Sequence, residues 1–160
     1  MNGDGIDDLI MGSPGATGGS RAGKVFVLFG KTSAWGATFD LSTLNGTNGV
    51  SFTGTDTLYG EDGFGVASGD VNRDGYDDVI IGARSYRTGL FGRGAVYVVY
   101  GAASYGSGDI NLSTVDGTNG YRVEGALSNE WCGSDVAAGD VNGDGYDDVL
   151  VGAQRTDSLR

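Results

Sequence analysis

The sequence has no histidine, a single cysteine and a single proline among its 160 residues. Histidine is the side chain that most often acts as a general acid or base near neutral pH, and no Gly-x-Ser-x-Gly nucleophile motif takes its place. One cysteine excludes an internal disulfide framework. Because no basic cluster lies near Cys132 in sequence, we expect a buried or half-buried small hydrophobe rather than a reactive thiol. These absences argue against an enzyme.

Positive charge and long apolar stretches are also scarce. The chain has 10 Lys and Arg against 21 Asp and Glu, for a formal net charge of −11 at pH 7, which disfavours nucleic acid and anionic membrane surfaces as partners. It contains no run of 18 apolar residues that could insert into a membrane. No signal peptide is expected, because Met1 leads directly into an acidic segment. The composition favours cations as ligands.

Glycine is abundant, with 32 residues, so we expect many tight turns and no long helices. The apolar residues fall into short runs rich in Val, Ile, Phe and Tyr, without helical period and bounded by Gly, Asp or Asn. These runs predict nine β-strands, within residues 7–12, 24–30, 49–54, 64–71, 77–82, 94–101, 120–125, 134–141 and 147–152. The runs at 25–29 and 95–100 are apolar on both faces, so layers must cover them on both sides. A stack of small sheets would provide that cover.

The chain repeats itself. GDVNRDGYDDVIIGA at 69–83 returns almost unchanged as GDVNGDGYDDVLVGA at 139–153, and a clipped copy, NGDGIDDLIMGS, occupies 2–13. Asp4, Asp74 and Asp144 hold the same place in the three copies, at a spacing of 70 residues. A second marker, FDLSTLNGTNG at 39–49, returns as INLSTVDGTNG at 110–120, so whole structural units are repeated.

Each acidic copy has the pattern of a calcium loop, with side-chain oxygens at positions 1, 3, 5 and 9 and glycine at position 6. A backbone carbonyl at position 7 can supply a further oxygen. The first complete loop offers Asp70, Asn72, Asp74, the Tyr76 carbonyl and Asp78, and the second offers Asp140, Asn142, Asp144, the Tyr146 carbonyl and Asp148. The clipped loop has Asn2, Asp4, the Ile6 carbonyl and Asp8 but lacks the position-1 aspartate. We therefore expect two complete Ca²⁺ sites and a third that binds weakly or not at all.

Other interpretations of these loops are weaker. Asp, Asn and Gly are also common in turns that hold no metal, but a plain turn does not need five special residues in fixed register, twice. An EF-hand needs Glu at position 12, where this chain has Ile81 and Val151, and the residues that follow are strand-like. The neighbouring pairs, such as Asp77 and Asp78, point to opposite faces of a strand and cannot flank one bond as a catalytic pair. We expect calcium to take one aspartate of each pair, and solvent or a turn hydrogen bond the other.

The aromatic residues allow two interpretations. Trp35, Trp131 and the tyrosines could form a platform that stacks on sugars, or they could pack within and between the sheets of a β-repeat. We expect packing, since that is the commoner use of aromatic side chains in such folds.

The stretch FGVASGDVNRDGYDDVIIGA, followed by GRGAVYVVYG, resembles the FG-GAP repeat of integrin α-subunit β-propellers and of bacterial surface proteins with integrin-like repeats. Phe64-Gly65 matches the FG element, and Gly82-Ala83 begins the GAP element. The chain departs from the motif at Ser134-Asp135, at Ser13-Pro14 and at Ala83-Arg84.

The resemblance implies an all-β partial propeller of four-stranded antiparallel blades, with calcium held between the first and second strands of a blade. It also implies a noncatalytic, calcium-stabilised module of an extracellular or cell-surface protein for adhesion or recognition, with a protein or carbohydrate as ligand. Two alternatives stay open: the propeller portion of a secreted enzyme such as a phospholipase, or an engineered self-assembling propeller fragment.

The count of predicted strands indicates where each blade begins and ends. Residues 1–160 form one array, with a partial blade at 1–63, a full blade at 64–133 and a partial blade at 134–160. With blade strands named A to D, the order is B-C-D, A-B-C-D, A-B. Exposed edges of this kind are normally paired or covered. We therefore expect a homo-oligomer, a trimer before a dimer, since three chains would supply about six blades.

Overall fold

The computed structural model describes residues 1–15, 23–54, 62–87, 92–106, 108–127 and 129–154, and the side chains of residues 62–64, including the Phe64 of the FG element, lie outside the described part. Ten strands and two single 3₁₀ turns make up its regular structure. The turns are η1 (Leu41–Thr43) and η2 (Leu112–Thr114). The strands are β1 (Leu9–Ser13), β2 (Lys24–Leu28), β3 (Gly49–Thr53), β4 (Asp62–Gly69), β5 (Asp78–Ala83), β6 (Ala95–Val99), β7 (Asp109–Asn111), β8 (Gly120–Glu124), β9 (Cys132–Gly139) and β10 (Asp148–Ala153).

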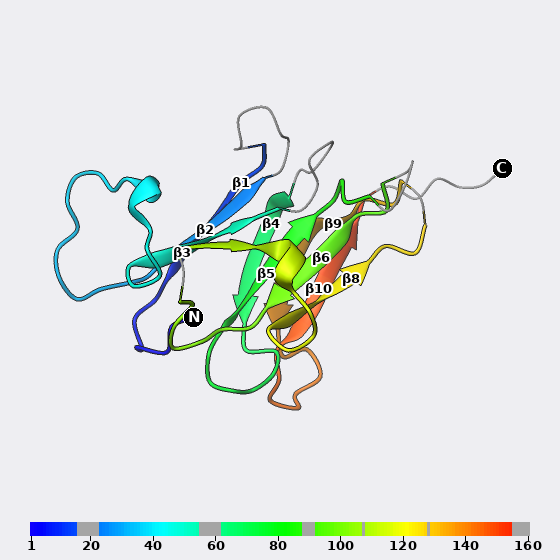
Figure 1. The fold of residues 1–160 in the computed structure, drawn as a ribbon. Coiled ribbons are helices and arrows are strands. Elements are labelled where there is room, and N and C mark those ends of the chain that lie inside the picture. The colour runs from blue at the N-terminus through cyan, green and yellow to red at the C-terminus, as the bar shows by residue number, and fades with distance from the viewer. Residues whose placement is uncertain (16–22, 55–61, 88–91, 107, 128, 155–160) are drawn as a thin grey trace.

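The strands form three small sheets that follow one another along the chain (Figure 1). The first has the order β1-β2-β3-β7, the second β4-β5-β6-β8, and the third pairs β9 with β10. Strand β4 packs against β1 on one side and against β9 on the other, so the second sheet lies between its neighbours. All nine predicted strands are present. The second and third sheets have the expected strand orders A-B-C-D and A-B, whereas the first has the expected B-C-D with a fourth strand, β7, added at its edge. No described segment forms a helix long and apolar enough to cross a bilayer.

The core lies between the sheets. Because side chains alternate along a strand, β5 and β6 send one set of residues toward each neighbouring sheet. Ile81 and Tyr97 belong to a buried cluster shared with the first sheet, whereas Ile80 and Val98 pack in a second cluster with residues of β9. Every residue of β5 and β6 is buried, as the two-sided apolar pattern of the 95–100 run requires.

Cys132 lies in the second cluster, and burial raises the pKa of its thiol. This confirms the expectation of a small buried hydrophobe. The aromatic residues fall into a buried group and an exposed group. Tyr97 is fully buried as expected, but Trp35 is 42% exposed and stacks edge-on against Phe39 at the surface. The prediction that aromatic residues pack within the sheets is therefore wrong for Trp35, which lies in a loop outside the sheets.

Two glycines of the FG-GAP pattern allow the second and third sheets to approach closely. A Cβ atom added at Gly82 would collide with the backbone carbonyl of Gly133, and one added at Gly65 would lie 3.2 Å from the Cα of Asp135. Side chains at these positions would push the sheets apart. The corresponding Gly152 has no neighbour closer than 3.4 Å, because no further sheet covers β10 among the described residues.

Strand β7 was not predicted. It runs parallel to β3, with Phe52 opposite Ile110, so the segment after β6 reaches back over the preceding sheet. Tyr105 packs against Phe29 and Phe52, with ring centroids 6.0 and 6.1 Å apart. Three residues without alternation give no strand signal, and the partner strand lies far away in sequence.

The carboxylate of Asp109 anchors β7. It accepts hydrogen bonds from the hydroxyls of Ser51 at 2.7 Å and Thr53 at 2.8 Å, and Lys24 Nζ lies 3.4 Å away. Although partial burial opposes the shift, the two hydroxyl donors and the lysine charge lower the pKa of Asp109 below 3.8. Folding therefore stabilises the ionised carboxylate.

We expect Asp109→Ala to lower the free energy of unfolding by about 1–2 kcal/mol, because it removes hydrogen bonds to a partly exposed charged acceptor. Thr38→Ala, at the equivalent position of the first unit, should change it little. Since the pKa of Asp109 is lower in the folded state, its contribution is present above pH 3.8 and disappears as the pH falls through the folded value. Urea unfolding at pH 7 and at acid pH measures both effects, and equal losses in the two variants would contradict the role of Asp109.

Candidate metal centre

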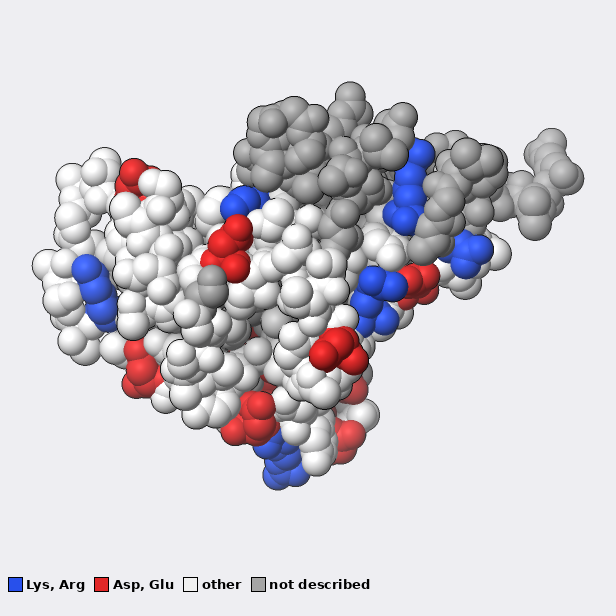
Figure 2. Space-filling model, in the orientation of Figure 1, with Lys and Arg blue, Asp and Glu red and all other residues white. Residues whose placement is uncertain are grey.

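The three acidic loops lie at one end of the sheets. We call residues 1–8 loop 1, residues 70–78 loop 2 and residues 140–148 loop 3; loop 2 joins β4 to β5 and loop 3 joins β9 to β10. Figure 1 shows loops 2 and 3 side by side below their strands, and a backbone hydrogen bond from Asp147 to Asp70 links them. Acidic side chains are visible at this end of the molecule in Figure 2.

Loop 2 is shaped by its own side chains. Asp70 accepts hydrogen bonds from the backbone N–H groups of Asp74 at 3.1 Å and Gly75 at 2.9 Å. Asn72 Oδ1 accepts from Asp74 N–H, and Asp74 Oδ1 accepts from Tyr76 N–H, both at 2.9 Å. Gly75 has φ +87°, a left-handed conformation that glycine adopts without steric cost. Positions 1, 3 and 5 are therefore held in one tight turn.

The other loops repeat this geometry. In loop 3, Asp140 accepts from the N–H groups of Gly143, Asp144 and Gly145, and Tyr146 N–H donates to Asp144 at 2.9 Å. The donor from Gly145, followed by those from Gly143 and Asp144, lowers the pKa of Asp140. Asn142 Oδ1 accepts from Asp144 N–H at 2.8 Å.

Loop 1 has the same turn without position 1. Asn2 Oδ1 accepts from Asp4 N–H at 3.1 Å, and Asp4 Oδ1 accepts from Ile6 N–H at 2.9 Å. Gly5 has φ +77°, in the same left-handed range as Gly75 at +87° and Gly145 at +86°.

The position-9 aspartates turn toward the sheets. Asp78 is fully buried and accepts from Val71 N–H at 3.0 Å and from Gly101 N–H at 2.8 Å. Asp148 accepts in the same way from Val141 N–H at 3.0 Å. In loop 1, Asp8 accepts from Gly30 N–H at 2.9 Å and forms an ion pair with the amino group of Met1 at 3.0 Å, which replaces the amide donor of the other loops.

Burial raises the pKa of Asp78 to about 6 against the lowering effect of its two N–H donors, and the charges of Asp74 and Asp70 raise it further. The two other carboxylates of the loop thus disfavour the charged form of the buried Asp78. A cation among them would favour the ionised form of all three.

The donor set fits a hard cation. Each complete loop offers three carboxylates, one amide oxygen and one backbone carbonyl, all of them oxygen ligands. Among the described residues no three acidic or thiol groups converge as a metal cluster by themselves. The amide, the carbonyl and water would have to share the coordination.

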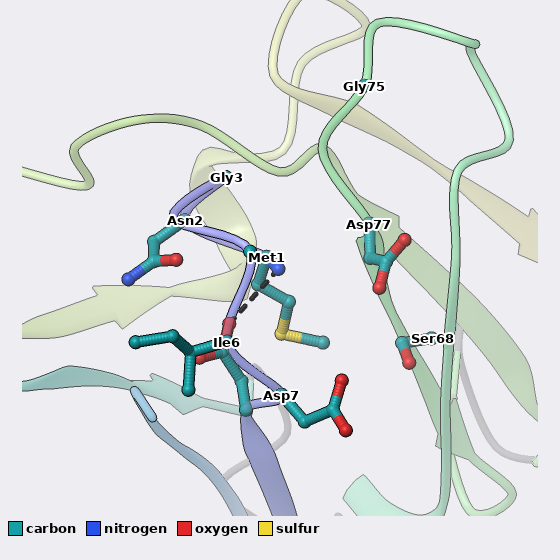
Figure 3. A pocket seen from close by; sticks show the side chains of 10 residues that line it. Met1, Asn2, Gly3, Ile6, Asp7, Ser68, Gly75 and Asp77 are labelled. Atoms are coloured by element: carbon teal, nitrogen blue, oxygen red, sulfur yellow. Dashed lines mark ion pairs between the residues drawn. The ribbon is translucent and has the colours of Figure 1, made fainter. Parts of the chain in front are cut away.

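Sequence reasoning missed the contacts between loops. Asp147, expected to meet solvent or a local turn, instead accepts from Asp70 N–H at 3.0 Å across the sheet boundary. The guanidinium carbon of Arg73 lies 5.4 Å from the ring centroid of Tyr146. Between loops 1 and 2 is a hollow lined by Asp7, Asp77 and Ser68 among others (Figure 3). The loop sequences are nearly identical, so the sequence did not indicate which loops would be in contact.

Small antiparallel sheets that stack side by side are the blades of a β-propeller. In the second and third sheets a loop rich in Asp and Asn connects the first two strands. The family model of the FG-GAP repeat matches residues 1–28, 63–99 and 133–158. The chain belongs to the FG-GAP repeat family.

Similar proteins are much longer than this chain. Integrin alpha pat-2 of Caenorhabditis elegans is 34% identical over 158 residues, which are 96% of this chain and 12% of that protein. Integrin alpha-4 of Xenopus laevis is 32% identical over 163 residues, with 99% of this chain and 14% of that protein covered. Phosphatidylinositol-glycan-specific phospholipase D of Rattus norvegicus is 38% identical over 96 residues, or 59% of this chain and 11% of that protein.

We expect Gly75→Ala to destabilise the metal-free protein by about 1–2 kcal/mol, since an alanine must adopt the left-handed conformation while meeting no steric obstacle. Gly139→Ala is the control, because its Cβ would also meet nothing within 4 Å and its φ is not in the left-handed range. Thermal unfolding in excess chelator compares them. If both variants unfold at the same temperature, the turn at position 6 does not depend on glycine.

Proposed function

We propose that this chain is a noncatalytic, calcium-binding β-propeller module of an adhesion or recognition protein, in which calcium is structural. The observation that carries this proposal is the repeated loop geometry, with the same Asx turns and the same all-oxygen donors at positions 1, 3, 5, 7 and 9. The charges of Asp74 and Asp70, which raise the pKa of the buried Asp78, support it, because a divalent cation would offset their effect on Asp78.

Calcium would be held by Asp70, Asn72, Asp74, the Tyr76 carbonyl and Asp78 in loop 2, and by the equivalent residues of loop 3. The ion supplies positive charge and ties the hairpin between the first two strands of a blade. Residues 1–8 offer Asn2, Asp4, the Ile6 carbonyl and Asp8, one carboxylate fewer than the other loops, and we expect them to bind calcium weakly or not at all. Folding and metal binding are then coupled, because the unfolded chain has no preformed cage.

The absence of histidine and of a nucleophile motif supports a noncatalytic role. The integrin alpha names of two relatives support placement outside the cell or on its surface, with a protein or carbohydrate as ligand. The phospholipase D relatives favour the alternative that such a module accompanies a secreted enzyme. A screen against phosphoesters and glycosides with calcium present separates the two, since turnover by the purified chain would overturn the noncatalytic assignment.

We expect titration calorimetry to find two strong calcium sites per chain, and Asp74→Ala or Asp144→Ala to remove about one equivalent each. At free calcium 100-fold above the dissociation constant each site adds about 2.7 kcal/mol, so chelation should lower the melting temperature by about 5–10 °C per site. Asp4→Ala in loop 1 is the control and should leave the strong sites unchanged. Unaltered stoichiometry in the Asp74 and Asp144 variants would refute the assignment.

The two outer sheets of the 160-residue chain present apolar side chains to solvent. Leu9 of β1 is 54% exposed and Leu150 of β10 is 45% exposed, whereas Val79 and Ile80, their counterparts in β5, are fully buried. Equivalent residues are thus covered only where a neighbouring sheet is present. A second copy of the chain would cover these faces with the contacts already seen inside the molecule, in a trimer first and a dimer second.

Light scattering at micromolar concentration should therefore give a mass near three times, or else twice, the 16.3 kDa of one chain. Leu150→Asp should shift the population toward monomer, because it places a charge on the contact face. Ser33→Asp, in the exposed loop between β2 and β3, serves as the control. A uniform 16.3 kDa species with a cooperative melt would contradict assembly.

A further inference from the structure

Loops 2 and 3 are joined by a reciprocal pair of hydrogen bonds across the boundary between two sheets. Asp147 N–H donates to the backbone carbonyl of Asp70 at 3.1 Å, and Asp70 N–H donates to Asp147 Oδ2 at 3.0 Å. Both backbone groups of the position-1 residue of loop 2 are therefore held by residue 147, which lies at position 8 of loop 3.

A second contact reinforces the pair. The ring of Tyr146, at position 7 of loop 3, lies under the guanidinium group of Arg73, at position 4 of loop 2. The same relation links loops 1 and 2, where the ring of Tyr76 covers Gly3 so closely that an added Cβ would lie 2.5 Å from Tyr76 Cε1. Loops 2 and 3 thus each contact the loop of the preceding unit.

Gly69 makes room for this contact. A Cβ atom at residue 69 would lie 2.6 Å from Asp147 Oδ2 and 2.8 Å from the Cβ of Ala138. At the equivalent Gly139 an added Cβ would meet nothing within 4 Å, since no further loop docks there among the described residues. The chain therefore offers matched positions with and without the contact.

Asp77 is the counterpart of Asp147 in loop 2. Its carboxylate lies at the hollow between loops 1 and 2 (Figure 3). Among the described residues it makes no contact with another loop like that of Asp147 with Asp70 N–H. It has the same chemistry and loop position as Asp147 and is next to Asp78 in sequence. Asp77 therefore controls for charge near loop 2 without the cross-sheet contact.

We propose that Asp147 is a positioning residue for the calcium site of loop 2. By fixing the backbone of Asp70 from the neighbouring sheet, it sets the direction of the position-1 carboxylate before the ion arrives, and such preorganisation raises affinity. Calcium binding by loop 2 then depends on a residue 77 positions away from Asp70 and not only on the loop's own nine residues. This inference rests on the proposed binding of calcium by loop 2.

The test uses the Asp144→Ala background, in which loop 2 is the remaining strong site. In that background Asp147→Ala should weaken calcium binding about tenfold by calorimetry, whereas Asp147→Asn, whose amide oxygen can still accept from Asp70 N–H, should stay within about threefold. Asp77→Ala should also stay within about threefold. Equal losses in Asp77→Ala and Asp147→Ala would overturn the proposal, because they would show a general charge effect.

Two further measurements distinguish a loss of positioning from general unfolding. Amide hydrogen exchange in chelator should show faster exchange of Asp70 N–H in Asp147→Ala, with the amides of β5 still protected. In the native chain, Gly69→Ala should weaken the loop 2 site while Gly139→Ala leaves both sites unchanged. Unchanged exchange at Asp70 would overturn the positioning role. If the native chain binds no calcium, the proposed function fails as well; if it binds two ions and the Asp147 variants bind normally, only the positioning role fails.

Discussion

The packing of one sheet against the next is the constraint on which this structure depends. Strands β5 and β6 carry apolar side chains on both faces, so neither face can be left to solvent, and the neighbouring sheets supply both covers. The cost of that arrangement is steric, because sheets that approach closely leave no room for side chains where their backbones meet. Gly65 and Gly82 satisfy this requirement at the contact with β9. The glycines of the repeat pattern are therefore packing residues as much as turn residues.

The same stacking brings the acidic loops together at one end of the sheets. Each loop folds its aspartates and asparagine onto its own backbone amides, which fixes the turn but leaves several negative charges close together. Eleven of the 21 acidic residues lie in these three loops, where carboxylate oxygens can bind a hard cation. A structural ion would offset the repulsion between Asp78 and the other carboxylates of its loop.

Neighbouring units are also joined outside the core. Strand β7 reaches back to β3 through Asp109, and Asp147 reaches from loop 3 to loop 2. The first of these polar links joins the first and second units, and the second joins the second and third units.

The sequence by itself determined the local structure. Apolar runs bounded by Gly, Asp and Asn placed nine strands, and the spacing of oxygen-bearing residues placed three turns, because both depend on interactions between residues close in the chain. Tertiary structure decided the rest. DVIIGA in β5 is buried throughout, whereas the nearly identical DVLVGA in β10 is largely exposed. Burial raises the pKa of Asp78 at the start of β5. Likewise β7 and the contact of Asp147 with Asp70 depend on partners in other sheets. The same residues meet different surroundings in each unit, so burial, pKa and partners follow from the position of a unit in the stack, which its own sequence does not encode.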